Sequence, residues 1–285
     1  MKTPKVFNEL AIKRGETLSV EGDCVFKCEI PEGVTITVTD GEAQFDAQIN
    51  SDVTIQSKSS KANNLSDGSV VGGSFNSVTI YGRSNRVIVN GQDITSQVSS
   101  SRAPGAGVIK VNAPIMNNVT LNADAQVEVT SNSVGQNFTA EAGASIQVKA
   151  VGQHARLDAG ASVNFDMLGD YSIVSAGASI KGEMVAKNCE LDAGASIKIK
   201  KDVYDYSSLD AGASIQVGRA FKNTSYDAGA SISADFADPS ASFDAGVRTQ
   251  IGKKMPLSVG TVTITAPVER NTPKGKVVNL FKGRK

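Results

Sequence analysis

Large aromatic side chains are scarce in this sequence of 285 residues. Tryptophan is absent, and phenylalanine, tyrosine and tryptophan together account for 5% of the chain. This composition does not favour an enzyme with a deep aromatic pocket. The three cysteines and single histidine are too few for a disulfide framework or a soft-ligand metal site. We therefore expect reduced cysteines and no bound metal or cofactor, with Cys24 and Cys28 alternating inward along one strand.

Long apolar runs are also missing. No stretch approaches the apolar length of a membrane-spanning helix. The N-terminal residues Met1–Glu9 have neither an apolar core nor a small-residue cleavage site, so no Sec signal peptide is predicted. We therefore expect the protein in the cytoplasm before assembly, or in a virion assembled inside a host cell.

A short repeat dominates the C-terminal half. The segment Asp-Ala-Gly-Ala-Ser-Ile, or a close variant, recurs with its central glycines at a nearly constant interval. A fixed short period indicates one structural unit stacked on copies of itself. The repeated glycines are Gly143, Gly160, Gly177, Gly194, Gly212, Gly229 and Gly246.

One repeat shows the alternation of a β-strand. From Leu191 to Ile199 every second residue is apolar, which predicts one strand with Leu, Ala, Ala, Ile and Ile facing inward. Ala195, at the centre of this run, is expected inside. One repeat is too short for a hairpin of two long strands but fits one coil of a β-solenoid. The predicted fold class is therefore all-β: a β-solenoid with a 17-residue coil.

A column of aspartates recurs with the repeat, and two interpretations of it stay open. Like charges one strand apart repel unless something neutralises them, which favours a ladder that binds a cation or a glycan. Alternatively, each carboxylate caps turn amides or pairs with a neighbouring lysine. The residues are Asp158, Asp192, Asp210, Asp227 and Asp244.

Charge is balanced overall, at 29 basic and 29 acidic residues, but not along the chain. The segment 270–285 has six basic residues and no acidic one. Such an arm favours contact with nucleic acid or an acidic partner surface, and a solvated tail is the alternative. The basic residues are Arg270, Lys274, Lys276, Lys282, Arg284 and Lys285.

The remaining sequence divides into four regions. Residues 1–97 are β-rich, and Ile36 and Val53, which are one repeat period apart, indicate that early solenoid coils begin there. The small polar residues of 98–107 predict a linker. Residues 108–253 carry the repeats, and 254–285 are expected to form a capping strand and the extended basic arm.

No catalytic motif is recognisable. The chain contains no nucleophile elbow, P-loop, Rossmann turn or zinc-protease helix. A catalytic carboxylate pair should interrupt the repeat, whereas these acids follow it. We therefore predict that the protein is not an enzyme and has no catalytic residues.

The repeats at 192–197, 210–215 and 227–232 resemble the Ser-Gly-Ala-Ser repeats of the auto-transporter adhesin head GIN domain family. This resemblance implies a right-handed β-helix with a surface or binding role. Residues 77–95 resemble short β-rich proteins encoded by phages more weakly. Bactofilins, which are cytoplasmic β-helix polymers, are similar in coil length but differ in sequence pattern.

These observations together predict a non-enzymatic structural protein. We expect an oligomeric β-solenoid component of a phage particle, with self-association and contacts to other structural proteins. Nucleic acid is a further expected contact of the basic arm. A surface-binding, adhesin-like module and a bactofilin-like polymerising scaffold are the alternatives.

Overall fold

The computed structural model describes residues 3–9, 13–59 and 107–254, together with the backbone of short strands at 70–71, 88–89, 92–93 and 263–265. All elements in these segments are β-strands. None of the described segments forms a helix long and apolar enough to cross a membrane. The basic arm at 270–285 lies outside the described residues.

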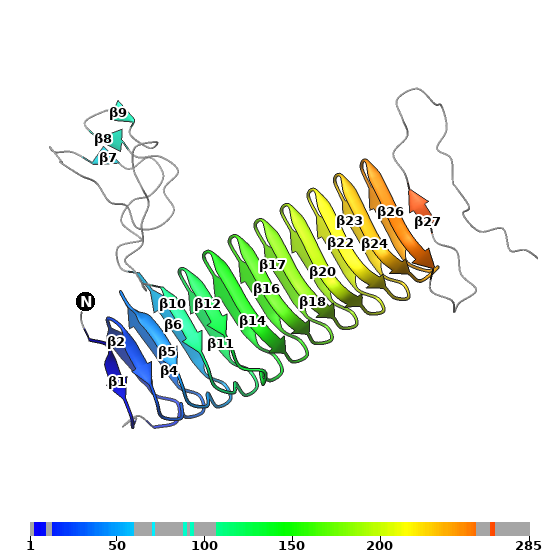
Figure 1. The fold of residues 1–285 in the computed structure, drawn as a ribbon. Coiled ribbons are helices and arrows are strands. Elements are labelled where there is room, and N and C mark those ends of the chain that lie inside the picture. Colours follow the sequence, from blue (N-terminus) through cyan, green and yellow to red (C-terminus); the bar gives the residue numbers. More distant parts are fainter. Residues whose placement is uncertain are drawn as a thin grey trace, which may run out of the picture.

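Two parallel sheets of twelve strands each form a single β-solenoid, which confirms the predicted fold class (Figure 1). Sheet A contains, in spatial order, β1 (Lys5–Phe7), β3 (Cys24–Phe26), β5 (Glu42–Phe45), β10 (Val108–Val111), β12 (Gln126–Val129), β14 (Ser145–Val151), β16 (Ser162–Leu168), β18 (Ser179–Val185), β20 (Ser196–Val203), β22 (Ser214–Ala220), β24 (Ser231–Ala237) and β26 (Arg248–Lys254).

Sheet B alternates with sheet A along the chain. It contains β2 (Thr17–Glu21), β4 (Thr35–Thr39), β6 (Thr54–Lys58), β11 (Thr120–Ala123), β13 (Thr139–Ala142), β15 (Arg156–Ala159), β17 (Ile173–Ala176), β19 (Glu190–Ala193), β21 (Ser208–Ala211), β23 (Ser225–Ala228), β25 (Ser242–Ala245) and β27 (Thr263–Thr265). A separate small sheet consists of β7 (Val70–Val71), β8 (Ile88–Val89) and β9 (Gln92–Asp93).

The repeat bends where the sequence predicted a straight strand. The run from Leu191 to Ile199 divides between β19 and β20, which belong to different sheets. Gly194 and Ala195 form the bend, and the Ala195 side chain is exposed instead of inward. Figure 1 shows that each coil turns sharply at this narrow edge and through a wider loop at the opposite edge.

The glycines are required at the narrow edge because the backbones approach closely there. A Cβ atom placed on Gly177, Gly194, Gly212, Gly229 or Gly246 would lie far inside van der Waals contact with the carbonyl oxygen of the preceding glycine in the column. None of these glycines has a positive φ. The lack of room for a Cβ atom, and not a requirement for positive φ, therefore explains the glycine column.

The wide edge is built from residues in the left-handed region. Tyr171, Asn188 and Tyr206 occupy equivalent turn positions with φ values of 59°, 54° and 62°. The Tyr206 backbone N–H donates to the carbonyl of Lys222 in the following coil, at 3.1 Å. The buried hydroxyl of Ser207 donates to the carbonyl of Ala186 at 2.8 Å. Hydrogen bonds between coils thus continue around the turn.

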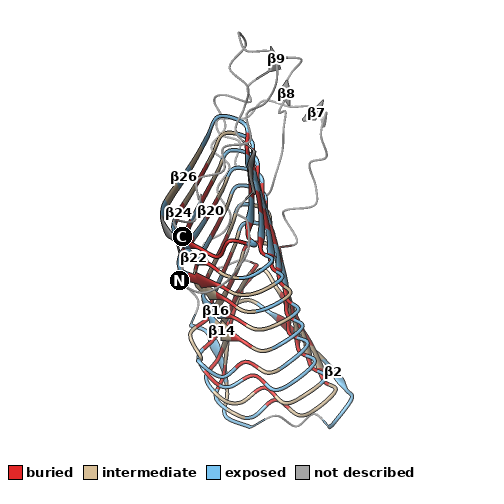
Figure 2. Ribbon diagram, turned by 90° about the vertical axis from the view of Figure 1, so that its right-hand side faces the viewer, coloured by how far each residue is buried: buried red, intermediate tan, exposed pale blue. Residues whose placement is uncertain are grey.

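The core is a continuous column of apolar side chains between the sheets. Figure 2 colours the buried residues red along the ribbon. In one coil, Leu191 and Ala193 of sheet B face Ile197 and Ile199 of sheet A, all fully buried. Aromatic rings of neighbouring coils also stack on one another, and the ring centroids of Tyr226 and Phe243 are 4.9 Å apart. This interval is the spacing of neighbouring β-strands.

The N-terminal coils belong to the same two sheets as the repeats. Strand β5 pairs with β3 on one side and with β10 on the other, so residues 60–106 intervene between two adjacent coils. Ile36 pairs with Ile55 and not with Val53. These longer coils contain an extra bridge between Ile30 and Ile49. The expected linker at 98–107 lies outside the described residues except for its last residue.

The thiols differ in exposure. Cys24 and Cys189 are buried, whereas Cys28 is only half-buried. The inward position predicted for Cys28 is wrong because β3 ends at Phe26 and Cys28 lies in the following turn. Burial raises the pKa of Cys24 to about 12 and that of Cys189 to about 11. Both thiols are therefore protonated and poorly nucleophilic at neutral pH.

Substitution of Gly194 by alanine tests the narrow edge. The new Cβ would displace the Gly177 carbonyl, and we expect a loss of about 1–3 kcal/mol in the free energy of unfolding. Urea unfolding followed by circular dichroism measures this loss. Ala195→Ser, at the neighbouring exposed position, is the control and should leave the unfolding free energy unchanged. Equal effects of both changes would contradict the close-approach explanation.

Candidate functional site

The aspartate column lies on the outer face of sheet B. Asp192 pairs in register with Asp210, Asp210 with Asp227, and Asp227 with Asp244. Asp158 is separated from Asp192 by Ser175. All five carboxylates are exposed. The structure therefore brings four of the five sequence-predicted residues together in one uninterrupted ladder.

Other aspartates cap the turns. The Asp170 carboxylate accepts a hydrogen bond from the Lys187 backbone N–H at 2.9 Å, and Asp205 accepts one from Lys222 at 3.2 Å. The four contiguous ladder carboxylates have no hydrogen bond or ion pair within the described part of the chain. Their column is therefore a row of like charges without an internal counter-ion there.

Electrostatics within the ladder disfavour ionisation at its centre. The pKa of Asp210 is raised, first because neighbouring atoms partly desolvate it and then because Asp227 and Asp192 repel its charge. Carboxylates one strand apart lie about 4.8 Å from each other. A cation or a cationic partner surface would relieve this repulsion.

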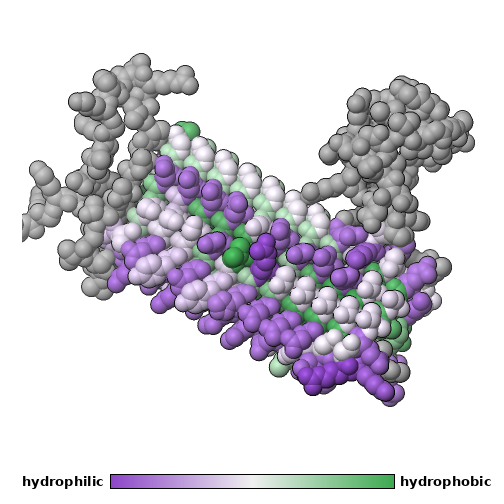
Figure 3. Space-filling model, turned by 180° about the vertical axis from the view of Figure 1, so that it is seen from behind, coloured by the Kyte–Doolittle hydropathy of each residue, from purple (hydrophilic) through white to green (hydrophobic). Residues whose placement is uncertain are grey.

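A shallow groove of about 450 Å³ follows the ladder across β21, β23 and β25. Its rims are a column of serines and the column of aspartates: Ser208, Ser225, Ser242, Asp210, Asp227 and Asp244. Figure 3 shows such rows of hydrophilic and near-neutral side chains running along the array. The described residues contain no cluster of three or more histidine, cysteine or acidic side chains placed to hold a metal ion.

Sheet A contains the main interruption of the repeat. Strand β20 has one residue more than its neighbours, and the register shifts on both sides of it. The extra residue forms a bulge at Lys200 and Lys201. Gly218 lies opposite, where a Cβ atom would be 2.6 and 2.5 Å from the carbonyl oxygens of these two lysines. The bulged backbone therefore requires a glycine in the next coil.

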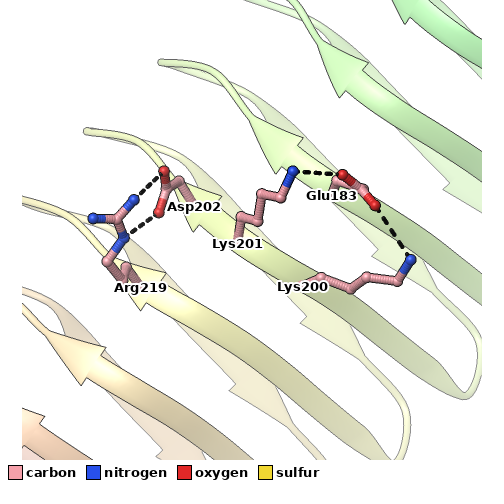
Figure 4. A network of polar contacts seen from close by, with 5 residues as sticks. All are labelled: Glu183, Lys200, Lys201, Asp202 and Arg219. Carbon is pink, nitrogen blue, oxygen red and sulfur yellow. Dashed lines mark hydrogen bonds and ion pairs between the residues drawn. The ribbon is translucent and has the colours of Figure 1, made fainter.

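The bulge supports a partly buried ion pair, shown in Figure 4. Arg219 donates from Nε and an Nη atom to the two carboxylate oxygens of Asp202, at 2.5 and 2.7 Å. The Asp202 side chain is 4% exposed and that of Arg219 is 52% exposed. The Arg219 guanidinium also lies 5.8 Å from the ring centroid of Phe221. These contacts position one cation firmly at the surface of sheet A.

A second charged group lies beside this pair in Figure 4. Glu183 accepts hydrogen bonds from Lys200 at 3.3 Å and from Lys201 at 2.7 Å. The bonds from Lys201 and then Lys200 lower the pKa of Glu183. All three side chains are solvent-accessible, so this group contributes surface charge more than stability.

A groove of about 290 Å³ adjoins the bulge on sheet A. Lys149, Lys181 and Lys200 line it together with the carboxylates of Asp166 and Glu183. No motif in the sequence predicts this irregular region. Its only signal was the step between Gly194 and Gly212, which is longer by one position than every other step in the series.

Removal of the Arg219 charge tests whether the Asp202 pair stabilises the bulge. In Arg219→Gln the buried carboxylate loses its charged partner, and we expect the unfolding free energy to fall by about 1–3 kcal/mol. Urea denaturation is the measurement. Lys201→Gln removes an exposed partner of Glu183 and should cost less than Arg219→Gln. A larger loss for Lys201→Gln than for Arg219→Gln would contradict this ranking.

Neutralising the centre of the ladder should stabilise the fold at neutral pH. Folding raises the pKa of Asp210. The wild type therefore loses stability as the pH rises from the pKa of Asp210 in the unfolded chain through its higher pKa in the folded protein. Asp210→Asn should therefore be more stable at neutral pH, by only about 0.2–0.5 kcal/mol because solvent screens the repulsion between these exposed carboxylates. The difference should vanish below about pH 3, where the wild-type carboxyl is protonated.

Urea unfolding of dilute protein at both pH values measures this effect. Asp235→Asn is the control, because Asp235 of sheet A lies between Ala234 and Phe236, whose register partners Val217 and Arg219 are not carboxylates. A destabilised Asp210→Asn variant would show that the ladder carboxylate makes a favourable contact instead of a repulsive one.

Comparison of this chain with known proteins yields no match to a family model, a curated protein sequence or a solved structure. The resemblance of its repeats to the head GIN domain family therefore stays a prediction.

Proposed function

We propose that this protein is a non-enzymatic structural component that self-associates within a larger assembly, and that the assembly is a phage particle. The observation that carries the proposal is the continuous array of twelve strands in each sheet. At about 4.8 Å per strand the array is roughly 50 Å long. Such a solenoid is suited to act as a stiff rod or wall element.

Stiffness follows from how the coils are joined. Each coil forms parallel ladders with its neighbours in both sheets, and its turn amides donate to carbonyls of the adjacent coil. The buried side chains form one continuous cluster from Val20 to Ala245. Bending the rod would therefore break backbone hydrogen bonds and core contacts at the same time.

The phage assignment combines the rod with two features of the sequence. The segment 77–95 resembles short β-rich phage proteins, and the basic arm at 270–285 offers a contact for nucleic acid or for an acidic structural protein. The coding sequence should then lie beside capsid or tail genes. Neighbouring cell-wall genes would instead favour the bactofilin-like scaffold.

Self-association is the first property to measure. We expect the purified full-length chain to form oligomers that grow with protein concentration, because its broad faces repeat regularly and carry uncompensated charge. Analytical ultracentrifugation and native mass spectrometry would follow the masses, and negative-stain microscopy the shape. A monomer at every concentration up to the millimolar range would contradict the proposal.

A glycan-binding, adhesin-like role is the second candidate, and the groove along β21, β23 and β25 favours it. Carboxylates and serine hydroxyls in a row are suitable partners for the hydroxyl groups of a sugar chain. A glycan array probed with the wild type and with the Asp210→Ala, Asp227→Ala variant tests this role. Binding that requires these two carboxylates would support it, whereas binding that is absent or unchanged would remove it.

A further inference from the structure

The two broad faces of the repeat region carry opposite charge. On sheet B, from β13 to β25, seven exposed carboxylates are opposed by one cation, Arg156. The carboxylates are Glu141, Asp158, Glu190, Asp192, Asp210, Asp227 and Asp244. On sheet A, from β14 to the described side chains of β26, seven cations are opposed by four carboxylates. The cations are Lys149, Lys181, Lys198, Lys200, Lys201, Arg219 and Arg248, and the carboxylates are Asp166, Glu183, Asp202 and Asp235.

Some of the cations on sheet A remain available to a partner. Glu183 and Asp202 already pair with the lysines of the bulge and with Arg219. Lys181 and Lys198 are exposed register neighbours in adjacent strands. Neither ammonium group forms an ion pair or hydrogen bond with a residue in the described ranges. Sheet A therefore presents a short positive column that mirrors the negative column of sheet B.

The two columns also share one period. Lys181 and Lys198 lie in directly paired neighbouring strands, as do Asp192 and Asp210. Because both rows follow parallel β-ladders, both repeat at about 4.8 Å. Rows of opposite charge with equal spacing coincide along their length when two solenoids lie side by side with parallel axes. A displacement by one whole coil preserves the match.

We infer that sheet A of one copy packs against sheet B of a second copy. This inference rests on the proposed self-association and names the faces that carry it. The small serines beside the aspartates let the partner's lysines approach the carboxylates. Because the two contacting faces differ, each bound copy exposes a fresh face, and the association extends into rows instead of closing as a symmetric dimer.

The size of the face sets the strength of one contact. A four-residue strand is about 13 Å long, and seven neighbouring strands extend over about 30 Å along the solenoid axis. The face therefore offers roughly 400 Å² per partner. A standard stable interface buries about 800 Å² per partner. Each contact should therefore be weak and sensitive to salt, and rows should form where many copies are concentrated.

Zero-length cross-linking of the full-length chain identifies the faces. A carbodiimide activates a carboxylate and leaves as a urea that retains one carboxylate oxygen, while a lysine amine in contact forms an amide bond with the carboxylate carbon. In a mixture of light and ¹⁵N-labelled protein, we expect mixed-isotope links from Asp192, Asp210 or Asp227 to Lys181 or Lys198. Links from these carboxylates to lysines of the basic arm, or no ladder links in the oligomer, would overturn the inference.

Charge reversal provides an independent test. Lys181→Glu with Lys198→Glu should weaken association about tenfold or more, and Asp192→Lys with Asp210→Lys should do the same. A chain that carries all four changes has its charges exchanged between the faces and should associate again. The control is Lys187→Glu with Lys222→Glu, which changes the net charge equally at the wide-edge turns and should have a smaller effect.

The outcomes separate this inference from the proposed function. Circular dichroism and thermal unfolding would first establish that each variant is folded. The assignment of faces would be overturned if oligomers persisted in both charge-reversed variants, or if the variant with all four changes failed to form oligomers again. Either result would leave the structural role standing. A wild-type chain that remains monomeric throughout would overturn both.

Discussion

Apart from the bulge in β20, the described coils of this protein lie in register on one another at the spacing of neighbouring β-strands, and the rest of the structure depends on that constraint. Each residue then has its own counterpart directly above and below. The constraint is tightest at the narrow edge, where Gly177, Gly194 and Gly212 stack backbone on backbone and no side chain fits. It is weaker at the wide edge, where Asn188 and Tyr206 occupy equivalent positions. Sequence variation is tolerated where the stacked atoms have room.

The same constraint explains what the sequence could predict. The period and the alternation of Leu191, Ala193, Ile197 and Ile199 follow directly from stacking, so the solenoid and most of its core were predictable. The bend was not, because a two-residue corner preserves the even spacing of inward positions on either side. Alternation alone therefore cannot distinguish a straight strand from two strands around a corner, and Ala195 was placed inside. The glycine at the corner was the available signal.

Two further features were hidden for different reasons. The early coils are slightly longer than the later repeats, as the pairing of Thr17 with Thr35 and of Thr35 with Thr54 shows, and β-branched residues are frequent there. The match between the repeat period and the interval from Ile36 to Val53 was therefore a coincidence. The contacts of the bulge were hidden because an extra residue in β20 gives no indication of which side chains it brings together. The pairing of Asp202 with Arg219 is long-range information that only the fold supplies.

Columns of identical side chains have an electrostatic consequence that a globular fold can avoid. In a compact domain, a surface carboxylate can be surrounded by cations from unrelated segments. In this solenoid, the neighbours of Asp210 in its column are Asp192 and Asp227, so repetition of a sequence also repeats its charge. The core requires apolar residues only at the inward, alternating positions of each strand. The outward positions of the two sheets can therefore carry different charges. A fold that separates charge onto opposite faces, and holds both at one spacing, makes a second copy of itself a complementary surface.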